Sequence, residues 1–270
     1  MFCSDTNEAI PFVDLASDKL ENETLNAIFL TCNCVDICEH IMKKFGVLAI
    51  CPENIKNFLP LCEDNSQVVD ENSEGNWSVL FANVDKNWSN SIVIVDNYLL
   101  RPNYLESNVF PIIDYFIHDS VDAPIKLEVT FFSSFKGANL NWKTFIYDRI
   151  STRYGDKIVL SLFSISDTEF HDRVIVTNNL WIECGAGFDL YKMENGILKA
   201  QKFTTLHVVS PFFNDSYYSW SHKAYRVLIN HISRILASNE MREYDVNVPV
   251  QYTYPNIYIG EKRNSILSYF

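Results

Sequence analysis

The sequence predicts an α/β protein in which helices flank a mostly parallel sheet, and three observations lead to this fold class. The chain has 270 residues, of which 47% are hydrophobic and only 21% charged, so it can bury a sizeable core. Glycine and proline number 8 and 9, too few for a collagen-like or linker-dominated chain. Strand and helix patterns alternate through the middle of the chain, which is typical of parallel strands joined by crossover helices.

A mainly helical extension is expected over residues 1–76. Apolar residues recur there at three- and four-residue spacing, and Pro52 suits the first turn of a helix. The expected elements are a helix over Glu21–Phe45 ended by Gly46, a buried strand over Val47–Ile50 and a short helix over Pro52–Cys62. The acidic stretch Glu63–Asn76 indicates a solvated loop that ends this extension.

The α/β core is expected over residues 77–213. Its predicted strands are Trp77–Val84, Ser91–Leu100, Ile125–Phe132, Ile158–Ile165, Asp172–Thr177, Leu180–Cys184 and Phe203–Val209. Its predicted helices are Glu106–His118 and Leu140–Tyr154. Asn178-Asn179 indicates a tight hairpin turn. Residues 214–270 then form a C-terminal helix, Tyr217–Ala237, and a tail packed on the core.

Charge and composition exclude several classes of function. The net charge is −12, and an acidic surface disfavours nonspecific binding to duplex nucleic acid. No apolar run approaches the length of a membrane span, and Met1–Glu8 lacks the basic start of a secretory signal. Gly185-Ala186-Gly187 is a lone Gly-x-Gly without the context of a dinucleotide fingerprint, and no cofactor is expected.

The cysteines indicate a reducing compartment. Seven is an odd number, and a chain of this size does not need disulfide staples, so we expect free thiols and a cytoplasmic location. Cys32, Cys34, Cys38 and His40 crowd together, which leaves two interpretations. The favoured one is small apolar cysteines packed in a helix, without metal; the other is a zinc site, which would require a break in the helix.

The segment with the clearest chemistry begins at His171-Asp172-Arg173. On a strand, His171 and Arg173 project from the same face, whereas Asp172 points the other way. An imidazole beside a guanidinium suits a phosphate pocket, since arginine supplies fixed charge and a forked donor. Gly185 and Gly187, just downstream, free the backbone for a sharp turn or a close approach to a ligand.

The order of these strands, helices and motifs resembles one half of a phospholipase D-like fold, over roughly residues 90–210. That family carries a His-x-Lys-x4-Asp motif on the hairpin, followed by a small Gly/Ser motif. The resemblance puts His171 in the nucleophile position, Arg173 in the lysine position and Asn178 in the aspartate position, with Gly185 and Gly187 in the Gly/Ser stretch. Two halves form one site in the family, so it also implies a homodimer or a subunit of a larger complex.

Departures from the family pattern argue against efficient catalysis. Arginine replaces the lysine, Asn178 cannot carry the aspartate charge, and the motif occurs once. We therefore expect a phosphate- or phosphodiester-recognising, or scaffolding, module similar to the C-terminal domains of some MIT-domain trafficking proteins. Family analogy suggests an intracellular assembly such as a bacterial antiviral defence system. The alternatives are a homodimeric, metal-independent phosphodiesterase or nuclease using His171, and a surface ion pair at Arg173.

We predict that the purified protein alone shows little or no cleavage of DNA, RNA or a generic bis-phosphodiester, with or without EDTA. An enzyme of this type would attack phosphorus with His171, form a phosphohistidine and need no metal. A cleavage assay with a His171→Ala control measures this. EDTA-resistant cleavage that the substitution abolishes would contradict the prediction.

Overall fold

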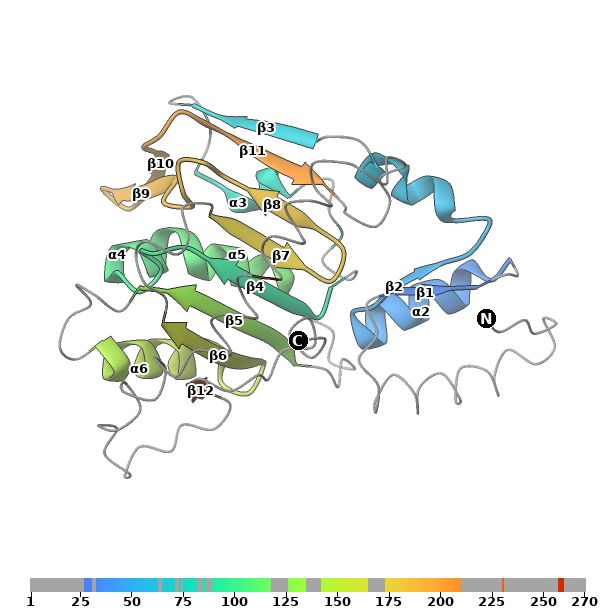
Figure 1. Ribbon diagram of the computed structural model, residues 1–270, viewed down its shortest axis with the longest axis horizontal. Helices are drawn as coiled ribbons and strands as arrows, with labels where there is room; N and C mark the ends of the chain where they lie inside the picture. Colours follow the sequence, from blue (N-terminus) through green and yellow to red (C-terminus); the bar gives the residue numbers. More distant parts are fainter. Residues whose placement is uncertain are drawn as a thin grey trace.

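A mixed eight-stranded sheet forms the centre of the protein (Figure 1). The computed structural model describes residues 27–30, 33–62, 65–70, 73, 75–81, 85, 89–117, 126–134, 142–164, 173–209, 230 and 257–259. In spatial order the strands of the sheet are β12 (Ile257–Ile259), β6 (Ile158–Ser164), β5 (Leu127–Ser133), β4 (Ser91–Val95), β7 (Val174–Thr177), β8 (Trp181–Glu183), β11 (Thr204–Val209) and β3 (Asn65–Val69).

Of the seven neighbouring strand pairs of this sheet, three are parallel and four antiparallel, which corrects the expectation of a mostly parallel sheet. Strands β12, β6, β5 and β4 are parallel to one another. From β4 onward, each neighbouring pair through β7, β8, β11 and β3 is antiparallel. Helical crossovers join β4, β5 and β6, whereas a tight hairpin joins β7 and β8, and each connection dictates the direction of its strands. Direction therefore changes at β4.

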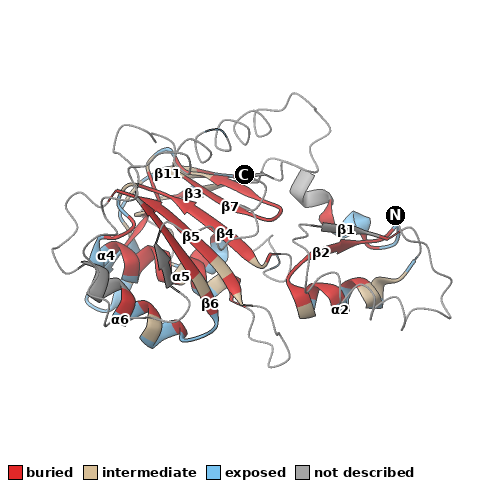
Figure 2. Ribbon diagram, turned by 60° about the horizontal axis from the view of Figure 1, so that its bottom comes forward, coloured by how far each residue is buried: buried red, intermediate tan, exposed pale blue. Residues whose placement is uncertain are grey.

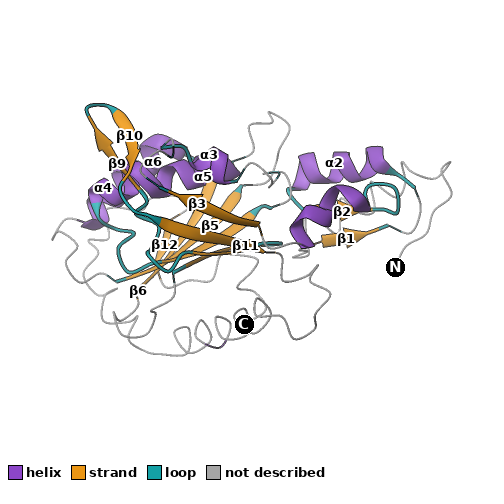
Figure 3. Ribbon diagram, turned by 90° about the horizontal axis from the view of Figure 1, so that it is seen from above, coloured by secondary structure: helices purple, strands orange, loops and turns teal. Residues whose placement is uncertain are grey.

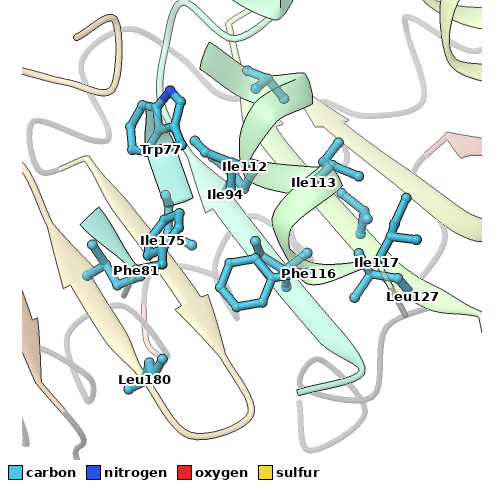
Figure 4. Close-up of a cluster of buried hydrophobic side chains, with 14 of the residues drawn as sticks. Trp77, Phe81, Ile94, Ile112, Ile113, Phe116, Ile117, Leu127, Ile175 and Leu180 are labelled. Carbon is cyan, nitrogen blue, oxygen red and sulfur yellow. The ribbon is translucent and has the colours of Figure 1, made fainter. Parts of the chain in front are cut away.

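The described crossover helices cover one face of the sheet (Figure 3), whereas the sequence led us to expect helices on both faces. The first crossover comprises α4 (Pro102–Tyr104), the π-helix η4 (Leu105–Val109) and α5 (Phe110–Phe116), and the second is α6 (Trp142–Tyr154). Figure 4 shows Ile112, Ile113 and Phe116 of α5 packed beside Ile94 of β4 and Ile175 of β7. This apolar layer fixes β4 beneath the crossover helix.

The segment that begins at Trp77 is a helix and not the expected strand Trp77–Val84. Helix α3 spans Trp77–Leu80, and Asn76 caps it by accepting a 2.9 Å hydrogen bond from the backbone N–H of Ser78. Trp77, Leu80 and Phe81 then share one buried face at helical spacing. The cap and this spacing outweigh the strand propensity of the aromatic residues.

The region before the sheet contains strands as well as the expected helices. Its elements are β1 (Ala27–Phe29), α2 (Val35–Phe45), β2 (Leu48–Ile50) and the 3₁₀ helix η2 (Ile55–Cys62). The expected helix over Glu21–Phe45 is wrong over Ala27–Phe29, because β1 pairs in parallel with β2. Gly46 ends α2 as predicted, in the left-handed conformation with φ 60°. Figure 2 shows β2 and one face of α2 buried against each other.

Strand β3 lies within the stretch expected to be a solvated loop, Glu63–Asn76. It pairs with β11, with Val69 opposite Thr204, and forms one edge of the sheet. Val69 is buried while Ser66 and Val68 are exposed, so the strand lacks a strong apolar pattern. As an edge strand, β3 pairs with one neighbour only, β11. The expected extension, residues 1–76, thus contains one strand of the eight-stranded sheet.

A hairpin absent from the sequence-based expectations joins β8 to β11. Strands β9 (Tyr191–Glu194) and β10 (Ile197–Ala200) meet at Asn195-Gly196, where φ is 52° and 80°. Asn-Gly is the strongest sequence signal for such a turn, because both central residues adopt positive φ. The hairpin forms a separate two-stranded sheet that projects away from the eight-stranded one (Figure 3).

The C-terminal expectations lie largely outside the described residues. Of the expected helix Tyr217–Ala237, only Asn230 is described, and it is helical. Strand β12 belongs to the tail and pairs in parallel with β6. No helix among the residues that the structure describes is long and apolar enough to cross a membrane.

Asn178, in the predicted hairpin turn, ties β7 to the start of β4. Its Oδ1 accepts hydrogen bonds from the backbone N–H groups of Asn90 at 3.1 Å and Ser91 at 3.0 Å. Its Nδ2 donates to Oδ1 of Asn90 at 3.1 Å. Asn178 is only 1% exposed, so water does not replace these bonds.

We predict that Asn178→Leu lowers the free energy of unfolding by about 2–5 kcal/mol, since each buried N–H left unpaired costs about 1–3 kcal/mol. Asn178→Asp keeps the acceptor for both N–H groups and should cost less. Urea denaturation of the two variants measures the difference. An equal loss of unfolding free energy in both variants would show that Asn178 does not stabilise the fold through the N–H groups of Asn90 and Ser91.

Candidate functional site

The candidate site lies at the carboxyl end of β4, where the strand direction changes. Asp96 directly follows β4. Val95 pairs with Val174, so Arg173, which precedes β7, lies at the same edge of the sheet. The hairpin returns the chain to this edge, where the Cys184 N–H donates to the Arg173 carbonyl at 3.1 Å. Ligands of open α/β sheets bind preferentially at such positions.

The buried carboxyl group of Asp96 accepts hydrogen bonds from three other residues. Its Oδ1 accepts from the backbone N–H of Tyr98 at 2.9 Å. Its Oδ2 accepts from the Tyr104 hydroxyl at 2.6 Å and from the backbone N–H of Phe188 at 3.2 Å. The side chain therefore joins the loop after β4, helix α4 and the turn after β8.

Burial dominates the electrostatics of this pair. It raises the pKa of Asp96 above its ordinary value of 3.8, against the opposing effects of the hydrogen bond from Tyr104 and the charge of Arg173. Burial, and then the adjacent carboxyl, raises the pKa of Tyr104 well above 10.0. Tyr104 is thus a hydrogen-bond donor over the whole physiological pH range.

Gly187 is required by both its backbone and its surroundings. Its φ is 88°, and a Cβ placed there would lie 2.9 Å from Cδ of Arg173 and 3.2 Å from Oδ2 of Asp96. Gly185 differs, because a Cβ there would meet no atom within 4 Å. The absent side chain at Gly187 lets the arginine pass over the buried carboxyl.

Two cations hold the carbonyl groups of the glycine turn. Arg173 donates from a terminal nitrogen to the Gly185 carbonyl at 2.8 Å, and Lys202 donates to the Ala186 carbonyl at 2.8 Å. Lys202 also forms an ion pair with Asp189. The N–H of Gly187 donates to the Cys184 carbonyl at 3.0 Å. The turn therefore positions cations at this edge instead of presenting the Gly187 N–H to a ligand.

A second guanidinium, that of Arg101, contacts the same tyrosine ring as that of Arg173. The guanidinium carbon of Arg101 is 4.2 Å, and that of Arg173 is 5.9 Å, from the centre of the Tyr98 ring. Tyr98 is 38% exposed and Arg101 is exposed, so solvent reaches this group. Only one of the five N–H donors of Arg173 is used by the bond to Gly185.

The structure brings together some of the sequence-predicted site residues and separates another. Arg173, Gly185 and Gly187 lie together at the carboxyl end of β4. Asn178 follows the opposite end of β7 and takes part in the contacts to Asn90 and Ser91. His171 lies outside the described residues.

Sequence reasoning missed Asp96, Tyr98, Arg101 and Lys202. Asp96 had a usable signal, because a carboxylate directly after a buried five-residue strand commonly faces a site. Arg101 and Lys202 gave none, since their positions depend on the loop after β4 and on the chain after the unpredicted β9–β10 hairpin.

The structure describes three of the four residues that crowd together in the sequence near Cys38: Cys34, Cys38 and His40. Cys38 is buried on α2, and its contacts include Cys34 and Cys51. Burial raises the pKa of Cys38 far above 9.0. His40 is exposed, and Cys32 lies outside the described residues. Within the described ranges, no three histidine, cysteine, aspartate or glutamate side chains form a group able to hold a metal ion.

Comparisons with known proteins add little. No family model matches the chain. No curated protein matches it either. Among solved structures, the chain is similar to TrmBL2, an archaeal chromatin protein described as showing a novel mode of DNA binding. The match has 15% identity and a TM-score of 0.27, and covers 58% of this chain and 52% of that one. A likeness this weak carries no argument about fold or function.

We predict that Asp96→Asn changes how stability depends on pH. A carboxyl whose pKa is raised on folding favours the folded state fully below its unfolded pKa, and this advantage is lost as pH rises through the folded value. The stability of the wild type relative to the variant should therefore be greatest in acid and shrink as pH rises above about 4. Urea denaturation at a series of pH values measures this difference. A difference that grows with pH would show that the ionised carboxylate is the favoured form.

Proposed function

We propose that the protein recognises phosphate groups at the carboxyl end of β4, as a phospholipase D-like half-site without efficient catalysis. The observation that carries this proposal is the pair of guanidinium groups of Arg101 and Arg173, both positioned on the ring of Tyr98. Arginine is well suited to phosphate, since its planar fork offers paired donors with fixed charge.

The local charge favours an anion although the whole chain is acidic. The chain carries −12, yet the guanidinium groups of Arg101 and Arg173 lie at this edge, while the charge of Lys202 is paired with that of Asp189. Asp96 is only 1% exposed, and its oxygens already accept three hydrogen bonds. An incoming anion therefore meets the guanidinium groups in solvent while the carboxyl stays beneath them.

The described side chains at this edge favour binding over turnover. Cys184 is the nucleophile type nearest to the glycine turn, but its buried thiol donates to the Gly187 carbonyl at 3.1 Å. Burial raises the pKa of that thiol, and a thiol is a weak nucleophile compared with a thiolate. Asp96 is only 1% exposed, so its carboxyl group is not accessible to a substrate as a general base.

The resemblance to phospholipase D-like proteins supports a wider role. Two halves make one site in that family, so we propose that a second copy or another subunit supplies the facing half. A scaffolding role in an intracellular assembly, including a bacterial defence system, rests on this family analogy alone.

We predict that Arg101→Ala and Arg173→Ala each weaken binding of inorganic phosphate about tenfold or more. A hydrogen bond to a charged group contributes about 1.5–3 kcal/mol, and about 1.4 kcal/mol corresponds to a factor of ten. Isothermal titration calorimetry measures the affinities. Lys157→Ala is the matched control, because it removes one exposed positive charge at the opposite edge, just before β6.

Phosphate binding by the wild type that is unchanged in both arginine variants would contradict the proposal. An equal loss in Lys157→Ala would also contradict it, since it would indicate a general effect of net charge. Far-ultraviolet circular dichroism of each variant establishes that the fold is intact.

A further inference from the structure

A cavity of about 670 Å³ has Arg101 in its lining. Residues of α4 and η4 line one side, and residues of β9 and its flanking segments line the other. Arg101 belongs both to this lining and to the group around Tyr98, so the cavity begins where the phosphate group is proposed to bind. Pockets for small ligands in proteins measure about 300–1,000 Å³.

Buried hydrogen bonds fix the two sides of the cavity relative to each other. Asn108 donates from Nδ2 to the Tyr191 carbonyl at 2.9 Å and accepts at Oδ1 from the Tyr191 N–H at 3.0 Å. Asn108 is only 1% exposed. Tyr104, another residue of the lining, donates a hydrogen bond from its hydroxyl to Oδ2 of Asp96 at 2.6 Å. The cavity therefore exists before a ligand binds, which lowers the entropic cost of binding.

The π-helix η4 supplies part of the cavity lining. It spans Leu105–Val109 and lies directly between α4 and α5. A π-helical turn inserts extra backbone into a helix and is common at functional sites. Here it carries Ser107 and Asn108, both buried polar residues of the cavity lining.

The charges of the lining are largely neutralised by neighbours. Glu106 pairs with Arg149 at 3.0 Å, Lys192 with Glu194 at 2.6 Å, and Asp189 with Lys202. Arg101 is different, since no described residue supplies it with an acidic partner within salt-bridge distance. Among the described residues of the lining, Arg101 is thus the cation without an acidic partner, and the other charged side chains are paired.

The uncharged lining is suited to hydroxyl groups. Asn103, on α4, and Gln201, just after β10, are exposed amides of the cavity lining. Gln201 donates from Nε2 to the Asp189 carbonyl, which leaves its Oε1 to accept from a ligand. Amides that both donate and accept match the hydroxyl groups of a polyol better than they match an apolar chain.

We propose that this cavity binds the polyhydroxylated body of a sugar phosphate, with its phosphate on Arg101 and Arg173. The inference rests on the proposed phosphate-binding function and adds the class of ligand. The phosphate provides the charge interaction with the guanidinium groups, while Asn103 and Gln201 recognise hydroxyl groups of the sugar.

Calorimetric titration of the full chain with inorganic phosphate, ribose 5-phosphate and adenosine 5′-monophosphate tests this proposal. We expect ribose 5-phosphate to bind about 5- to 150-fold more tightly than phosphate, since two hydrogen bonds of about 0.5–1.5 kcal/mol each are added. Adenosine 5′-monophosphate reports whether a base adds to the sugar, and the sugar proposal predicts no gain over ribose 5-phosphate.

Variants locate the sugar-binding contribution. Asn103→Leu and Gln201→Leu should abolish the advantage of ribose 5-phosphate while leaving phosphate affinity unchanged, and Arg173→Ala should weaken both ligands. Gln67→Leu, on the distant edge strand β3, is the matched control and should change neither.

The outcomes separate the two proposals. If phosphate and ribose 5-phosphate bind equally, the phosphate site stands and the sugar proposal is wrong. It is also wrong if the advantage survives both amide substitutions, or if the nucleotide alone binds more tightly than phosphate. If neither phosphate nor ribose 5-phosphate binds, the proposed function fails, and the sugar proposal fails with it.

Discussion

The buried carboxyl of Asp96 is the contact on which the arrangement of the candidate site depends. It accepts hydrogen bonds from three chain segments: the loop after β4, helix α4 and the turn after β8. Burying a carboxyl group is costly unless donors surround it, and here each donor comes from a segment that the site needs. Removing the carboxyl would free Tyr104, Phe188 and the loop from one another.

Gly187 and Arg173 follow from that contact. The turn brings the Phe188 N–H to Asp96, and a side chain at Gly187 would collide with both Arg173 and the carboxyl. Arg173 then lies over the carboxyl, with its guanidinium bonded to the Gly185 carbonyl and directed toward Tyr98. The glycine and arginine of the motif are therefore parts of one packing arrangement with a carboxyl that precedes them by many residues.

The sequence predicted the elements with strong local signals and missed those set by distant contacts. Gly46 ended α2, and apolar patterns located α5 and β4 through β6, because these signals are local. The expected strand Ser91–Leu100 was too long, since β4 ends at Val95 and a turn follows Asp96. Strand β3 was missed because its stability comes from pairing with β11, and α3 because its cap outweighs strand propensity. At the site, Arg173 and its glycines were found from a motif, whereas Arg101 and Lys202 depend on loops whose paths the sequence pattern does not specify. Asn178 illustrates the limit of motif reasoning, since its amide completes backbone contacts at the far end of β7.

The span between Asp96 and Phe188, which are 92 residues apart, couples the site to the folding of the whole sheet. Long-range contacts of this kind form late in folding, because chain entropy must be lost before they are made. The intervening residues include β5, β6, β7 and β8, so no shorter fragment containing only one side of the contact can assemble the cation group. A ligand held there would bind only the state in which both halves of the mixed sheet have joined at β4. Its binding would therefore raise the free energy of global unfolding by mass action, in addition to any local stabilisation of the loop.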